Sequence, residues 1–180
     1  HAYDVEVMLG AELNILDEQG TVDLTENTLA QMDLAIASLH IPCIVPGSRE
    51  YNTQACVNAV KNPRIHILGH PDDPRYPVDF RAIVQAAKEY GTLLELNENS
   101  LRPGGSRKNT RPQDEEMLKL CVEYQVPIVI GSDAHTDTDV GRHDLAHALL
   151  EELHFPEELI VNRSVDALKT VLENKRLQLK

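Results

Sequence analysis

The stretch Pro127-Ile128-Val129-Ile130-Gly131-Ser132-Asp133-Ala134-His135 carries the clearest signal for the fold of this chain. Its first half is continuously apolar, which is typical of a strand buried on both faces of a parallel sheet. Its second half places Asp133 and His135 two residues apart, so that in extended backbone both side chains point to one face. The stretch therefore predicts a buried parallel strand that ends in two side chains able to bind metal.

Further β-rich runs alternate with amphipathic helical segments along the 180 residues. They predict strands at Val5–Leu9 continuing to Ile15, at Leu34–Leu39, at Ile65–Leu68, at Thr92–Leu96 and at Leu159–Val161. Between them apolar residues recur at helical spacing; Gly91 is predicted to end one helix and Ser164 to cap another. Such alternation predicts a parallel sheet covered by helices, either an open doubly wound sheet or a barrel.

The bulk composition predicts one soluble domain covering residues 1–180. A formal net charge of −12 argues against a nucleic-acid or membrane-surface binder, and no apolar run approaches the roughly 20 residues that span a bilayer. The three cysteines lie far apart, without a C-x-x-C spacing. A sparse, odd set argues against a disulfide framework, so we expect a cytoplasmic protein.

Polar residues stand where each predicted strand ends. Glu12, His40 and His70 follow the first three strands, and Asp133 and His135 follow the fifth. In a βα barrel these strand ends converge on one rim, where active sites lie, and that convergence favours the barrel over the open sheet. A single histidine is more often structural than a ligand; it is the recurrence at successive strand ends that predicts a metal site. Imidazole and carboxylate ligands favour zinc, manganese or iron.

Motifs along nearly the whole chain resemble the PHP (polymerase and histidinol phosphatase) superfamily, within it the small single-domain phosphatase-like branch. The matching segments are Gly10-Ala11-Glu12-Leu13-Asn14, Leu39-His40, Asn52-Thr53-Gln54-Ala55, Gly69-His70-Pro71, Pro74-Arg75-Tyr76, Leu94–Ser100 and Gly131-Ser132-Asp133-Ala134-His135. The resemblance implies a distorted (β/α)7 barrel with up to three metal ions. It also implies that Glu12 bridges two ions, that His40 and His70 complete one of them, and that Asp133 and His135 serve the others.

The chain departs from this family at its start. The family's H-x-H strand and T-D-H-type second strand have no counterpart, so we expect an N-terminally truncated barrel of about five to six βα units. Such a barrel would expose two sheet edges. We therefore expect little activity from the chain alone, and either self-association or pairing with a complementing N-terminal fragment.

The stretch from Leu101 to Arg111 concentrates four cations in an acidic chain. Because this stretch follows a strand end, it would lie over the rim of the barrel that holds the metal, where Arg102 and Arg107 could bind a phosphate. A mobile solvated loop is an equally good interpretation. Arg75 and Arg142 are further candidates for substrate binding.

The leading functional prediction is a metal-dependent phosphoric monoester phosphatase acting on a small phosphorylated substrate. Glu12, Asp133 and His135 would serve catalysis by holding divalent ions. Such ions lower the pKa of bound water to about 7 and bind the oxygens of the phosphate. A phosphodiesterase or exonuclease-like activity is the alternative enzyme class, and it would need a basic groove that the net charge of −12 disfavours. An inactive truncated module is the non-enzymatic alternative.

Overall fold

The computed structural model describes residues 6–177, which contain five strands and six α-helices. The strands are β1 (Gly10–Asn14), β2 (Leu34–Ser38), β3 (Ile67–Leu68), β4 (Leu93–Asn97) and β5 (Ile128–Gly131). The α-helices are α1 (Glu26–Leu29), α2 (Arg49–Lys61), α3 (Phe80–Tyr90), α4 (Arg111–Tyr124), α5 (Asp144–Glu152) and α6 (Val165–Leu177). The three short 3-10 helices are η1 (Asp137–Asp139), η2 (Glu157–Leu159) and η3 (Val161–Arg163).

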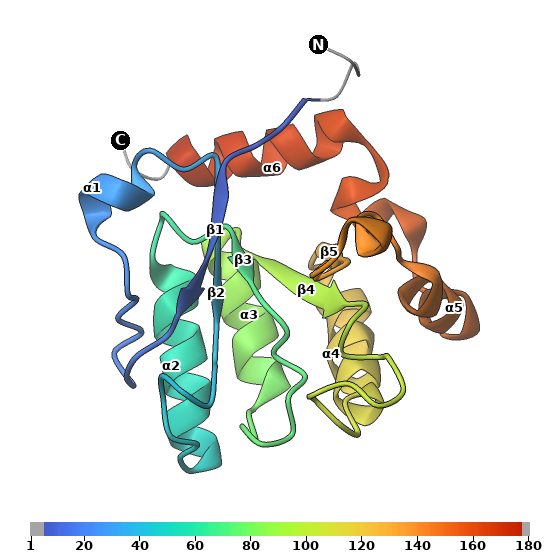
Figure 1. Ribbon diagram of the computed structural model, residues 1–180, viewed down its shortest axis with the longest axis horizontal. Helices are drawn as coiled ribbons and strands as arrows, with labels where there is room; N and C mark the ends of the chain where they lie inside the picture. The colour runs from blue at the N-terminus through green and yellow to red at the C-terminus, as the bar shows by residue number, and fades with distance from the viewer. Residues whose placement is uncertain (1–5, 178–180) are drawn as a thin grey trace.

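The strands form one parallel sheet in the order β1-β2-β3-β4-β5. Helices α2, α3 and α4 pack side by side along it, and α6 crosses the strands on the other side (Figure 1). This confirms the predicted parallel sheet covered by helices. The predicted barrel is not closed, because β1 and β5 remain the two ends of the sheet.

One face of the sheet is divided into an apolar half and a polar half. On β4, Leu94 and Leu96 point into the main core, while Leu93, Glu95 and Asn97 alternate onto the opposite face. Near the strand starts this face is apolar and packs against Leu168 and Val171 of α6. Near the strand ends it is polar, so α6 covers one half and the other half can hold a site.

Lys175 joins α6 to the rest of the molecule through hydrogen bonds. Its side chain is only 1% exposed, and Nζ donates to Val60 O at 3.1 Å, Tyr90 O at 2.8 Å and Thr92 Oγ1 at 2.7 Å. Those two carbonyls end α2 and α3, where helix dipoles favour a cation. A lysine in an otherwise ordinary amphipathic helix thus joins α6 to two helices on the far side of the sheet.

The predicted strand at Leu159–Val161 is wrong. The segment forms parts of η2 and η3, with a single parallel bridge between Ile128 and Ile160. The cause is Asn162, whose side-chain amide accepts from Ile130 N at 3.1 Å and donates to Ile130 O at 2.9 Å. Because one side chain satisfies both backbone groups, no strand is needed beside this part of β5.

The predicted helix ends are confirmed. Gly91 ends α3 in the left-handed conformation at φ 64°, and Ser164 Oγ accepts from Ala167 N at 3.1 Å at the start of α6. The first strand begins later than predicted, at Gly10, and Val5 lies outside the described residues. None of the helices within residues 6–177 combines the length and the apolar character needed to cross a membrane.

Candidate metal centre

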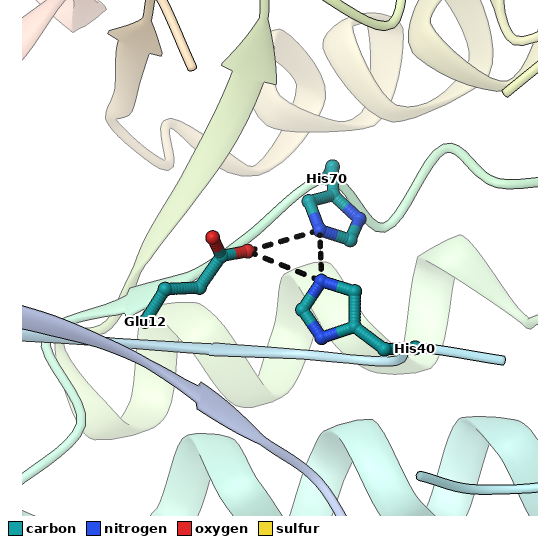
Figure 2. A group of neighbouring side chains, drawn as sticks. All are labelled: Glu12, His40 and His70. Carbon is teal, nitrogen blue, oxygen red and sulfur yellow. Dashed lines mark hydrogen bonds and ion pairs between the residues drawn. The ribbon is translucent and has the colours of Figure 1, made fainter. Parts of the chain in front are cut away.

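Three of the predicted ligands meet at the ends of neighbouring strands. Glu12 lies on β1, His40 two residues after β2, and His70 two residues after β3. Their side chains point toward one another (Figure 2), with His70 Nε2 at 3.0 Å and His40 Nε2 at 3.4 Å from Glu12 Oε1. A metal site needs several His, Cys, Asp or Glu side chains with their ligand atoms close together. Among the described residues, these three form the one group of at least three whose ligand atoms all lie within 4.8 Å of one another. The prediction that these three residues cluster is confirmed.

The geometry of this group suits a divalent metal ion. The two Nε2 atoms lie 3.1 Å apart, so the three ligand atoms form a triangle with edges of 3.0, 3.1 and 3.4 Å. Zinc bound to nitrogen or oxygen at about 2.05 Å in a tetrahedron requires edges of roughly 3.3 Å. The triangle therefore has the size of one face of a zinc coordination shell.

Neighbouring side chains orient two of these ligands. Asn14 Oδ1 lies 2.8 Å from His40 Nδ1, which fixes that nitrogen as the donor and turns Nε2 toward Glu12. Ser38 Oγ donates to Glu12 Oε1 at 2.8 Å. Asn14 on β1 and Ser38 on β2 are paired in the register of the sheet, so each side chain reaches the ligand that lies on or just after the neighbouring strand.

His70 is held by a buried carboxylate behind it. Glu95 Oε2 accepts from the His70 backbone N at 2.8 Å, and the His70 side chain is 3% exposed. The backbone of His70 has φ 28°, a left-handed value that a residue with a Cβ adopts at a cost. Such strain is typical of functional positions whose surroundings enforce the conformation.

The electrostatics of Glu12, His40 and His70 favour the binding of a cation. Hydrogen bonds from His40 and His70 hold the pKa of Glu12 well below its usual range, against the opposing effect of burial. Burial would lower the pKa of His70, but the hydrogen bond to Glu12 and the charges of Glu95 and Glu12 raise it overall. Glu12 is thus a carboxylate at neutral pH, and a positive charge beside it is stabilised.

Asp133 and His135 form a separate pair after β5. Asp133, at φ 47°, accepts at Oδ2 from Arg107 Nη2 at 2.8 Å and from the Asn97 and Asn99 amides at 3.4 and 3.3 Å. The other oxygen, Oδ1, lies 3.6 Å from His135 Nδ1, and His135 is 75% exposed. Their metal-ligand and catalytic roles therefore stay predictions.

The arginines predicted to bind substrate are each paired with a carboxylate of the chain. The pairs are Arg75 with Asp73, Arg102 with Asp139, Arg107 with Asp133 and Arg142 with Asp144. Only Arg107 reaches a predicted ligand, and its side chain is 10% exposed. The substrate-binding role stays a prediction for all four.

Sequence reasoning missed the residues that support the ligands. Asn14 and Ser38 lie two residues from Glu12 and from His40 respectively, which places each of them on the same strand face as its neighbour. That period of two is the signal that could have found them. Glu95 lies on β4, and its contact with the backbone of His70 depends on the pairing of β3 with β4, which the sequence alone does not give.

The chain is similar to proteins named probable phosphatases. It is 44% identical over 173 residues to one of Caldanaerobacter subterraneus, covering 96% of this chain and 67% of the relative. It is 45% identical over 162 residues to one of Caldicellulosiruptor saccharolyticus, covering 90% and 66%, and 39% identical over 173 residues to one of Clostridium novyi, covering 96% and 70%. The chain thus spans about two thirds of the length of these relatives.

Comparison with solved structures supports the fold. A chain in a cryo-EM structure of archaeal ribonuclease P with mature tRNA matches with a TM-score of 0.64 at 18% identity, covering 99% of this chain and 73% of that one. No family model matches the sequence. The similarity to the curated relatives, at 39 to 45% identity over most of the chain, is nevertheless extensive, and the chain belongs to the family of these probable phosphatases.

Proposed function

We propose that this chain carries the metal-binding part of a metal-dependent phosphatase that hydrolyses phosphate monoesters. Glu12, His40 and His70 would hold a divalent ion, zinc in the first place and manganese or iron as alternatives. The observation that carries the proposal is the triangle of ligand atoms, with edges of 3.0 to 3.4 Å, in a member of a probable phosphatase family.

Each residue of the group has a distinct task. Glu12 supplies the negative charge, and His40 and His70 would bind the ion through their Nε2 atoms, with the His40 ring held in place by Asn14. When bound, a divalent ion provides Lewis-acid activation of water and of the phosphoryl oxygen. Asp133, with Oδ2 already held by Arg107, could offer Oδ1 to a neighbouring ion, and His135 is exposed enough to turn toward one.

A small phosphorylated molecule fits this arrangement better than a nucleic acid. The chain has a net charge of −12, so a polyanion would meet repulsion over most of the surface. A single phosphate needs only local cations, and guanidinium groups bind phosphate oxygens in pairs. Arg107, in contact with Asp133, is the nearest arginine to the predicted ligands and the first candidate for that contact.

The test compares two artificial esters on protein stripped with a chelator and reloaded with zinc or manganese. In line with the low activity expected of the chain alone, we expect slow, metal-dependent hydrolysis of p-nitrophenyl phosphate, still slower hydrolysis of bis(p-nitrophenyl) phosphate, and a loss of roughly 100-fold or more in His70→Asn. His154→Asn is the matched control, because His154 is exposed and its φ of 50° suits asparagine. Hydrolysis that survives metal removal would overturn the proposal, a preference for the diester would replace it with a phosphodiesterase, and metal binding without hydrolysis would limit it to a binding site.

A further inference from the structure

A cavity of about 440 Å³ lies between the segment that follows β4 and the helix α5. One wall comes from residues 100–111 and the other from residues 145–152 of α5. A volume of this order is within the usual range for small-molecule sites.

Basic residues outnumber acidic ones in the lining of this cavity, although the protein as a whole is strongly acidic. Four cations line it, and Glu152 is the one carboxylate among the lining residues; the cations are Arg102, Arg107, Lys108 and Arg111. Arg102, Arg107 and Arg111 are paired with carboxylates, whereas Lys108 is exposed and makes no hydrogen bond or ion pair with any described residue. Because the chain as a whole carries −12, the unpaired ammonium group of Lys108 gives an anion a specific place to bind.

The opposite wall is apolar. Leu145, Ala148 and Leu149 present the side of α5 to the cavity. The position of α5 is fixed by the buried Glu98, whose carboxylate accepts from Leu145 N at 3.2 Å and from Ala146 N at 2.8 Å. A ligand here would place carbon atoms on α5 and its charged group toward the segment 100–111.

Arg107 connects this cavity to the candidate metal centre. Its Nε donates to Ser100 Oγ at 2.8 Å on the cavity side, and its Nη2 donates to Asp133 Oδ2 at 2.8 Å and to Asn97 Oδ1 at 3.2 Å. Asn97 in turn donates to Glu95, which accepts from the backbone of His70. A continuous series of hydrogen bonds therefore runs from the triad to the wall of the cavity.

We propose that this cavity binds a second anionic group of the substrate, so that the preferred substrates are small phosphate monoesters carrying a carboxylate or another phosphate on a short carbon skeleton. The inference rests on the proposed function, because it assumes that the phosphate to be hydrolysed lies at the metal centre. Arg107 would lie between the two anionic groups, and Lys108 would contact the second one. Lys108 is thus a specificity-determining residue.

The test uses a matched pair of ligands that differ in one carboxylate. Binding of 3-phosphoglycerate and of glycerol 3-phosphate to the zinc-loaded chain is measured by calorimetry. A charge-assisted contact in a partly exposed cavity favours the carboxylate-bearing ligand by roughly tenfold. Lys108→Ala is expected to reduce this preference to about twofold or less. Lys119→Ala, which removes the same charge from an exposed position on α4, is the control and should leave the preference near tenfold.

The outcomes separate this inference from the proposed function. Equal affinity for the two ligands, or a preference that persists in Lys108→Ala, would overturn the second anionic site. In that case metal-dependent hydrolysis of both esters would leave the phosphatase proposal standing. Conversely, a preference that depends on Lys108 in a protein that hydrolyses neither ester would support the anionic site and contradict the activity.

Discussion

Replacing Gly69 by alanine is expected to damage the metal centre without touching a ligand. A Cβ added at Gly69 would lie 2.3 Å from Ser38 Oγ and 2.8 Å from Ile36 Cγ2, both too close for ordinary contact. Ser38 is fully buried, and its hydroxyl donates to Glu12 Oε1 at 2.8 Å. The added methyl group therefore forces Ser38 away from Glu12.

Two effects set the expected size of the damage, a loss of folding stability and a loss of metal affinity. Overpacking of a buried position costs about 1–3 kcal/mol. Losing a hydrogen bond that orients a metal ligand reduces metal affinity by roughly 10–100-fold. Urea denaturation of the metal-free protein measures the first effect, and zinc competition against a fluorescent chelator measures the second.

The double variant Ser38→Ala/Gly69→Ala separates them. Removing the hydroxyl relieves the 2.3 Å contact, so part of the stability should return, while zinc affinity should stay as low as in Ser38→Ala alone. If Gly69→Ala has the stability and the zinc affinity of the unchanged protein, the packing of Ser38 between Gly69 and Glu12 is not as described.

Three further predictions concern stability. Glu98→Ala should lower the free energy of unfolding by about 1–3 kcal/mol, because the first amides of α5 lose a buried carboxylate acceptor; an unchanged urea midpoint would contradict this. Burial lowers the pKa of Lys175 from 10.5 to about 8, so the unfolded chain binds the extra proton between these values and stability should rise from pH 8 to 10.5. In Lys175→Met that rise should disappear, and the same pH dependence in both proteins would refute the assignment. Burial and the nearby Asp72 raise the pKa of Asp114 from 3.8 to about 9, so the folded protein holds the extra proton and stability should fall as pH rises through this window. Asp114→Asn should therefore gain stability relative to the unchanged protein at pH 8 more than at pH 5, and an equal difference at both values would count against a protonated Asp114.

Strands β3, β4 and β5 could be predicted because nearly all of their residues are buried on both faces of the sheet. Ile128-Val129-Ile130 gives a continuous apolar signal that a single sequence carries by itself. The helix ends at Gly91 and Ser164 were predictable for a similar reason, since each depends on the chemistry of one residue. Glu12, His40 and His70 could be proposed together once the strand ends had been located, because parallel strands end on one side of the sheet.

Other features depend on contacts between distant segments. The sequence of Leu159–Val161 predicts a strand, but the side chain of Asn162 makes the hydrogen bonds to the backbone of Ile130 instead. No local sequence pattern predicts that contact. In the same way, the pairing of Arg107 with Asp133 joins residues from different loops. Self-association and a complementing fragment remain predictions, as does the cytoplasmic location.

Zinc binding to variants of the triad tests the central claim most directly. X-ray absorption of the chain loaded with one equivalent of zinc should show nitrogen and oxygen donors at about 2.0–2.1 Å, including two imidazoles and no sulfur. The imidazole contribution and the tight binding should both be lost in Glu12→Gln/His70→Asn and kept in His154→Asn. Equally tight binding with an unchanged spectrum in Glu12→Gln/His70→Asn would contradict the assignment of Glu12, His40 and His70 as the metal site.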